Sequence, residues 1–131
     1  PDATAFLSRL VTNDPHPLTN GQAQYTVMCY PTGGAVDDLI IYRLDQDHYL
    51  AIVNASNKDK DFEWMQQQVG GLNVTLADRS DDYGLLALQG PRAVEILRPL
   101  TDVDLDAMPY YTARSGHVAG LPVVVSRTGH G

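Results

Sequence analysis

GGAVDDLIIYRL, from Gly33 to Leu44, organises the first half of the chain. Two glycines end a turn, two acids follow them, and an apolar run with the composition of a β-strand comes next. A carboxylate at the start of a buried strand raises the free energy of the fold unless it is paired or used. Asp37 and Asp38 are therefore the first residues that need an explanation.

The predicted strand separates these two acids. Because successive side chains of a strand point to opposite faces, Asp38 shares a face with Tyr42, about 13 Å further along, and Asp37 lies on the other face. A flat ligand could lie between the carboxylate and the phenol. The carboxylate would there pair with a protonated nitrogen or orient a nucleophile.

Two further polar side chains are expected near Asp38. The turn PTGG predicts a hairpin, and the pairing brings Tyr25 of the preceding strand toward the same face. Asn54 ends a third strand, where its amide could recognise the edge of a heterocycle. Each residue also has a plainer explanation, because adjacent aspartates after glycine often cap a turn and tyrosines on strands usually pack. An asparagine in this place is more often a loop or cap residue, so the residues alone leave both interpretations open.

Apolar periodicity and turn residues predict helices and strands along the whole chain. The expected helices are 1–12, 55–69 and 91–100. The expected strands are 22–30, 35–43, 49–54, 73–80, 84–90, 110–116 and 121–127. No break in composition marks a linker, so the sequence predicts one α+β unit.

An internal repeat relates the two helices that begin with proline. Six positions of the first copy match the second at an offset of about ninety residues, and each copy leads through a loop into strands. The matched positions are Pro1, Ala3, Phe6, Leu7, Leu10 and Asp14 against Pro91, Ala93, Ile96, Leu97, Leu100 and Asp104. The repeat predicts two related halves.

Composition excludes several classes of function. The chain has 131 residues, 44% of them hydrophobic, and a formal net charge of −7. This acidity argues against a nucleic-acid partner, which requires lysine and arginine. No apolar run is long enough to span a membrane. Cys29 is the only cysteine and the four histidines lack ligand spacing, so no metal site is expected.

Five segments resemble one known family, and they occur in that family's order. They are PDATAFLSRLVTND (1–14), GQAQYTVMCYPTGGAVDDLIIYRL (21–44), YLAIVNASNKDKDFEWM (49–65), LLALQGPRAVEIL (85–97) and VSRTGHG (125–131). The chain resembles the aminomethyltransferase, or T-protein, of the glycine cleavage system. The resemblance implies an α+β folate-binding fold of two intertwined ferredoxin-like β-α-β halves. Residues 1–131 would be part of a single folate-binding domain, truncated at both ends.

The resemblance also implies a reaction. The family moves the methylene of an aminomethyl group, carried on the lipoyl arm of H-protein, to N5 of tetrahydrofolate, and ammonia leaves. Tetrahydrofolate would be a co-substrate, lipoylated H-protein the partner, and no metal, nucleic acid or membrane would take part. The location would be the cytoplasm of a bacterium or the mitochondrial matrix of a eukaryote. Because the family sequence extends past both ends, the chain by itself is expected to keep the fold and weak affinity without turnover.

Residue by residue, the resemblance makes Asp38 the catalytic acid, supporting folate N5 electrostatically. The same matching implies that Tyr25, Tyr42, Asn54 and Tyr111 contact folate. His130 stands where the family usually has a tyrosine, and its imidazole can stack or hydrogen-bond in that place.

Two other readings of the resemblance stay open. A similar folate-binding module is attached to the flavin domain of dimethylglycine and sarcosine dehydrogenases. A relative without transferase activity serves iron–sulfur assembly. The first would be decided by the flanking sequence, and both by release of ammonia from aminomethylated H-protein.

Overall fold

The computed structural model describes residues 1–128, and the contacts within it divide the chain into two units, Pro1–Asp81 and Asp82–Gly131. Each unit is described by itself. Both combine helices with antiparallel strands, as an α+β chain requires. From the sequence, residues 1–131 are expected to be part of a single domain. That the two units form one domain stays a prediction.

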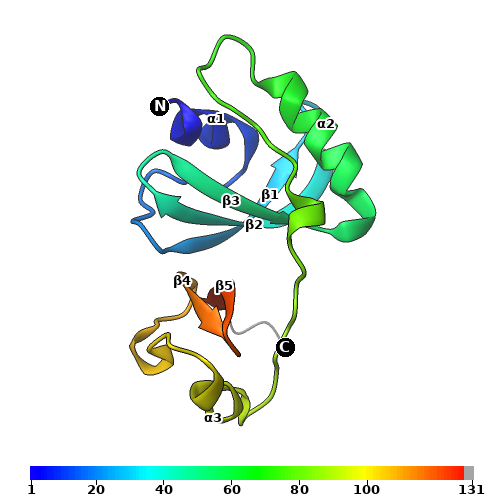
Figure 1. Cartoon of the computed structure of the whole chain (residues 1–131). Coiled ribbons are helices and arrows are strands. Elements are labelled where there is room, and N and C mark those ends of the chain that lie inside the picture. Colours follow the sequence, from blue (N-terminus) through cyan, green and yellow to red (C-terminus); the bar gives the residue numbers. More distant parts are fainter. Residues whose placement is uncertain (129–131) are drawn as a thin grey trace. The chain divides into compact units, whose positions relative to one another are not determined.

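The first unit is a three-stranded antiparallel sheet with two helices (Figure 1). Its strands follow one another along the chain and across the sheet, so each turn joins neighbours. The elements are α1 (Ala3–Leu10), β1 (Ala23–Cys29), β2 (Ala35–Asp45), β3 (His48–Val53), the short 3₁₀ turn η1 (Ala55–Asn57) and α2 (Lys58–Gln68).

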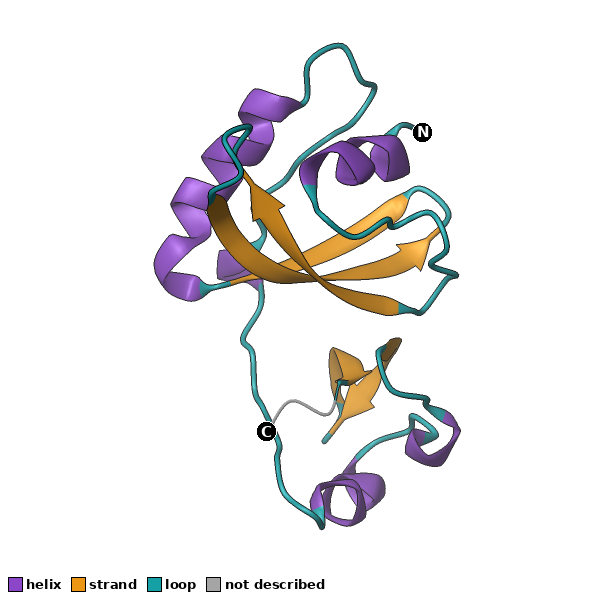
Figure 2. Cartoon of the chain, turned by 180° about the vertical axis from the view of Figure 1, so that it is seen from behind, coloured by secondary structure: helices purple, strands orange, loops and turns teal. Residues whose placement is uncertain are grey.

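Both helices pack on one face of this sheet, as Figures 1 and 2 show from opposite sides. The buried core draws on α1, α2 and the inward positions of the strands, and burial of this apolar surface stabilises the unit. Its members are Phe6, Leu7, Leu10, Val11, Met28, Val36, Leu39, Ile41 and Met65. No helix of the first unit packs on the opposite face, which carries Asp38, Ile40 and Tyr42.

The turn between β1 and β2 sets the register that separates the acids. Gly33 has φ of +92°, a conformation that favours glycine, and the N–H of Tyr30 donates to the carbonyl of Gly34 at 2.7 Å. The ladder then pairs Val27 with Asp38. A bulge between Met28 and Cys29 lies beside the acids, where bulges often redirect side chains.

The second unit is built around a two-stranded antiparallel hairpin. Short helical turns precede the hairpin, and a further 3₁₀ turn, η2 (Ser80–Asp82), lies where the two units meet in the sequence. The elements are α3 (Ala93–Leu97), η3 (Arg98–Leu100), η4 (Leu105–Ala107), β4 (Thr112–Val118) and β5 (Leu121–Arg127). None of the helices within residues 1–128 has the length and apolar content needed to cross a bilayer.

The internal repeat is confirmed by two isolated β-bridges. Val11, after α1, bridges Met28 at the end of the first strand of its unit. Thr101, after α3 and η3, bridges Val118 at the end of the first strand of the second unit. Both partners of the second bridge lie ninety residues after those of the first, so the two units share one helix–loop–strand framework.

The strands expected at 73–80 and 84–90 are wrong. The first segment keeps the predicted alternation, since Leu72, Val74 and Leu76 are half-buried against the core. It pairs with no strand among residues 1–128, and an unpaired segment is not a strand, whatever its side chains suggest. In the second segment Leu86 is 95% exposed, so its apolar pattern has no partner to cover it within the described residues.

The helix expected at 91–100 is present but shorter, because it ends in the 3₁₀ turn η3. Its apolar stripe is not buried: Ile96 and Leu100 are both about half exposed. A two-stranded hairpin offers too little surface to cover such a stripe.

Candidate functional site

The two acids of the opening segment lie at the start of β2 and on opposite faces of the sheet, as predicted. Asp37 is buried on the face that carries the helices, whereas Asp38 is half-buried on the other face. The carboxylate of Asp37 also accepts the backbone N–H of Asp38 at 2.9 Å. One acid therefore holds the backbone, and the other is left to contact a ligand.

Asn54, the residue directly after β3, forms hydrogen bonds with both acids. Its side-chain amide nitrogen donates to Oδ1 of Asp37 at 2.7 Å and to Oδ1 of Asp38 at 2.8 Å. These contacts use both amide hydrogens, so only the carbonyl oxygen of Asn54 is left to meet a ligand. The structure thus gives Asn54 a structural task beside the ligand contact that the resemblance implies.

Tyr25 holds the other carboxylate oxygen of Asp38. Its hydroxyl donates to Oδ2, and the ring is 48% exposed on the same face. Asp38 is therefore fixed from two sides, by a phenol and by an amide, with half of the aromatic surface beside it open.

Asp61 belongs to this cluster and was not predicted from the sequence. It lies on α2, is completely buried, and its carboxyl group is within hydrogen-bonding range of Asp37. The available signal was helical spacing, because Asp61 is four residues before the core residue Met65 and so shares its face.

The surroundings of Asp37 and Asp61 shift the pKa values of these two buried acids in opposite directions. Burial raises the pKa of Asp61 to about 7, and the neighbouring carboxyl of Asp37 adds to that rise. Burial alone would also raise the pKa of Asp37, but hydrogen bonds from Asp61, Asn54, the backbone of Asp38 and Asn57 outweigh it and lower the pKa to about 2. Of the buried pair, Asp37 therefore carries the charge and Asp61 the proton.

Three other predicted residues are placed less closely or not at all. Tyr42 is on the Asp38 face and only 6% exposed. Tyr111 belongs to the second unit, where it precedes β4 with φ of +59°. His130 lies outside the described residues.

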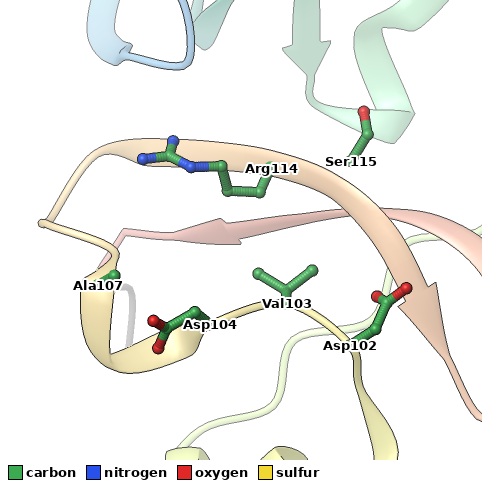
Figure 3. A pocket seen from close by; sticks show the side chains of 6 residues that line it. All are labelled: Asp102, Val103, Asp104, Ala107, Arg114 and Ser115. Atoms are coloured by element: carbon green, nitrogen blue, oxygen red, sulfur yellow. The ribbon is translucent and has the colours of Figure 1, made fainter.

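A separate hollow of about 260 Å³ lies in the second unit (Figure 3). The lining residues come from the loop after η3, from the end of η4 and from β4, and none of them was predicted as a site residue. They are Asp102, Val103, Asp104, Ala107, Arg114 and Ser115. Asp102 is already occupied, because its carboxylate accepts the backbone N–H of His117 at 2.7 Å and contacts the imidazole at 2.9 Å.

The acid cluster of the first unit is suited to binding a nitrogen heterocycle. A fixed carboxylate beside an exposed aromatic ring can accept N–H groups and stabilise a developing positive charge. The half-buried Ile40 continues this surface along β2. Within residues 1–128 no group of three or more histidine, cysteine or acidic side chains has a metal-binding arrangement.

Known proteins resemble the chain over nearly its whole length. The family described as the GCVT N-terminal domain matches residues 1–131. An aminomethyltransferase of Desulfitobacterium hafniense is 49% identical over 129 residues, which are 98% of this chain and 35% of that protein. An aminomethyltransferase of Listeria monocytogenes is 47% identical over 131 residues, or 99% of this chain and 36% of the relative. Another from Anoxybacillus flavithermus is 50% identical over 130 residues, or 98% and 35%.

A solved structure agrees with these sequences. The crystal structure of the glycine cleavage system aminomethyltransferase T from Bartonella henselae matches with a TM-score of 0.72 and 25% identity, over 86% of this chain and 30% of that one. The chain spans about a third of the length of its curated relatives. The predicted α+β class and the predicted family are both confirmed: the chain belongs to the GCVT N-terminal domain family.

Proposed function

We propose that the protein carrying this chain is an aminomethyltransferase of glycine cleavage. It moves the methylene of an aminomethyl-lipoyl group on H-protein to tetrahydrofolate and releases ammonia. The relatives reported above carry that name, and the Bartonella henselae protein is described as the aminomethyltransferase T of the glycine cleavage system.

One observation in the chain itself carries the proposal. Asp38 is anchored by Tyr25 on one carboxylate oxygen and by Asn54 on the other, and it remains half-buried rather than sealed. A surface acid that serves only to cap a turn does not need two side-chain anchors, one from β1 and one from the residue directly after β3. A preorganised carboxylate is what a reaction with a developing positive charge requires.

The residues present fit a reduced pterin. The exposed part of the Tyr25 ring and the half-buried Ile40 form an apolar surface on which a flat ring system can lie. Asp38 is the acceptor for the N–H groups at the edge of that ring system. Tetrahydrofolate would supply the nitrogen that takes up the one-carbon unit.

Within this site the division of labour follows from the contacts. Asp38 orients the ligand and stabilises positive charge next to it, while Tyr25 and Asn54 hold its two oxygens. Asp37 stays ionised and fixes the backbone of β2 below the site. Contacts from Tyr42, Tyr111 and His130 to folate remain part of the proposal.

The test is an assay of ammonia and methylenetetrahydrofolate formation by the complete gene product. Aminomethylated H-protein and tetrahydrofolate are supplied together, and H-protein without its lipoyl group is the control. We expect ammonia to be released in a tetrahydrofolate-dependent manner. Tetrahydrofolate binding without transfer from H-protein would favour the demethylase module or the iron–sulfur relative, and absence of both binding and transfer would contradict the proposal.

The finer details remain proposals of the same kind. A cytoplasmic or mitochondrial location follows from the family reaction, and fractionation of the source cells tests it. Nothing in the contacts of the first unit favours the two alternative functions, and the relatives reported above are not named after them.

A further inference from the structure

Asp61 is the one completely buried acid in residues 1–128, and the proposed reaction gives it no task. It lies on α2 next to the core, where an aspartate replaces the apolar residue that the helical stripe would otherwise carry. Burial of a carboxyl group without a partner strongly destabilises a fold, so a residue in this place needs a compensating contact.

The hydrogen-bond donors around Asp37 and Asp61 show which contact compensates for this burial. Within residues 1–128, Oδ2 of Asp37 and both carboxyl oxygens of Asp61 are buried, and no N–H or hydroxyl group donates to them. The two carboxyl groups nevertheless lie within hydrogen-bonding range of each other. Two carboxylates cannot bond, because neither has a hydrogen to give, so one of them carries a proton.

The proton belongs on Asp61. The other oxygen of Asp37 already accepts the amide of Asn54 and the backbone N–H of Asp38, which favour the ionised form of Asp37. Asp61 has no such donors, and its burial favours the neutral form. Asp61 thus donates its own O–H to Asp37.

We propose that Asp61 is a positioning residue for Asp38: it holds Asp37 by a carboxyl–carboxylate hydrogen bond, and Asp37 and Asn54 together hold Asp38. The inference rests on the proposed function, because the placement of Asp38 matters for turnover only if Asp38 serves the reaction. The chain of contacts runs from α2 through β2 to the end of β3 and back to Asp38.

The charged groups around Asp61 decide when this contact fails. Asp37 faces it from β2 and, together with the charge of Asp38 on the other face of that strand, opposes its ionisation, whereas Lys60 on α2 favours ionisation. The ammonium group of Lys60 is itself bonded to the carbonyl of Val36 at 2.9 Å. As pH rises above neutral, Asp61 ionises, the donated hydrogen bond is lost, and two buried carboxylates repel each other.

The experiment compares Asp61→Asn and Asp61→Leu in the complete gene product, with Asp59→Asn as the matched control. Asparagine keeps the shape and a donor and cannot ionise, leucine removes the donor and places a larger apolar side chain there, and Asp59 is an exposed acid of the same helix. The initial rate of ammonia release is measured from pH 5.5 to 8.5 (range chosen to be about 1.5 units either side of the Asp61 pKa). Folding of each variant is checked by circular dichroism.

We expect Asp61→Leu to lower kcat about 10- to 100-fold, the size of effect known for the loss of groups that support the ligands of a metal site. Asp61→Asn should keep the rate of the unmodified protein at low pH and should lack its alkaline decline. Asp59→Asn should match the unmodified protein throughout. Rescue by asparagine is a result that mere loss of core packing would not give.

Two results would overturn the inference. One is an Asp61→Leu variant that folds and keeps both kcat and the pH profile. The other is an Asp61→Asn variant with an unchanged alkaline decline, which decides the matter even if the leucine variant does not fold. The ¹³C resonance of the Asp61 carboxyl group provides a readout without turnover: a protonated group at pH 6 is expected, and an ionised one would refute the inference. Failure of the proposed function is distinct, since the unmodified protein would then release no ammonia.

Discussion

The two units of this chain share a framework and differ in what it carries. In each unit, the residue after the helical segment forms a β-bridge with the end of the first strand. The backbone N–H of the following residue then donates to a carbonyl of that strand. Thr12 donates to Val27 at 2.9 Å in the first unit, and Asp102 donates to His117 at 3.3 Å in the second. The hairpin that follows carries acids in the first unit only. Val27 pairs with Asp38, whereas its counterpart His117 pairs with Pro122.

This difference shows that the framework does not create the site. The repeated helix and bridge fix where the first strand begins, and the partner strand decides what chemistry is placed there. In the second unit the position of Asp38 holds a proline, which has neither charge nor N–H. The proposed function therefore depends on residues that differ between the two copies of the repeat, and variants of these residues should separate activity from folding.

The largest expected effect is on activity. Asp38→Asn should lower transfer about 1,000-fold, roughly 4 kcal/mol of transition-state stabilisation, because the neutral amide cannot stabilise positive charge. The measurement is the rate of ammonia release at saturating tetrahydrofolate. Asp37→Asn is the comparison, since Asp37 faces the other side of the sheet. Greater inactivation by Asp37→Asn with the fold intact would mean that the wrong acid has been assigned.

The next effect is on stability as a function of pH. The pKa of Asp61 is raised to about 7 in the folded chain from an ordinary value of 3.8, so folding takes up a proton between these two values. The free energy of unfolding should therefore fall by about 2 to 4 kcal/mol as pH rises from 4 to 7. For Asp37, whose pKa is lowered to about 2, stability should fall as pH drops below 4.

Urea unfolding at a series of pH values measures both trends. Asp61→Asn should remove the decline above pH 4 and keep the decline below it, because only the second depends on Asp37. Equal slopes in the variant and the unmodified protein between pH 4 and 7 would mean that Asp61 is ionised in the folded chain.

A smaller effect on stability is expected where β4 of the second unit packs against the loop after η3. A Cβ atom on Gly116 would lie 2.3 Å from Cγ2 of Val103 and 2.8 Å from a carboxylate oxygen of Asp102. Gly116→Ala should destabilise the second unit by about 2 kcal/mol, and the loss should show as faster hydrogen exchange in β4. Val103→Ala in the same chain should recover part of it. Gly34→Ala is the control, because its nearest contact would be 3.9 Å away; similar losses for both would rule out the steric explanation.

The smallest effect is at the matching position of the first unit. Thr26 is buried where the second unit has Gly116, and its hydroxyl accepts the backbone N–H of Asn13 at 3.1 Å. Thr26→Val should destabilise the first unit by about 1 kcal/mol, since that N–H loses its acceptor. The exposed Thr32→Val should change stability by less than about 0.5 kcal/mol. If chemical unfolding did not separate the two variants, the hydroxyl would have no part in holding the loop.

Much of the first unit follows from local pattern. Strand alternation and the glycine turn were enough to place Asp38 with Tyr25 on one face and Asp37 on the other, because both depend on residues close in sequence. The repeat predicted the common framework of the two units for the same reason. The sequence pattern did not predict how α2 is rotated about its axis. That rotation brings Asp61 next to Asp37, which lies 24 residues earlier in the chain.

The sequence pattern also could not predict which strands pair with segments far away in the sequence. The segment 73–80 has the correct alternation, yet a strand needs a partner, and whether one is present depends on the whole chain rather than on eight residues. Leu85 and Leu86 were predicted to lie in the strand 84–90 for the same reason, and both are exposed in the described residues.

The central claim, that the ligand site is the acid cluster of the first unit, is tested most directly by methyl NMR during titration with tetrahydrofolate. In the complete gene product, the methyl groups of Ile40 and Ile52 report on the face beside Asp38, and those of Val103 report on the hollow of the second unit. The account predicts that the Ile40 resonance shifts in step with tetrahydrofolate and loses this response in Asp38→Asn. A shift at Val103 with Ile40 unmoved would contradict it.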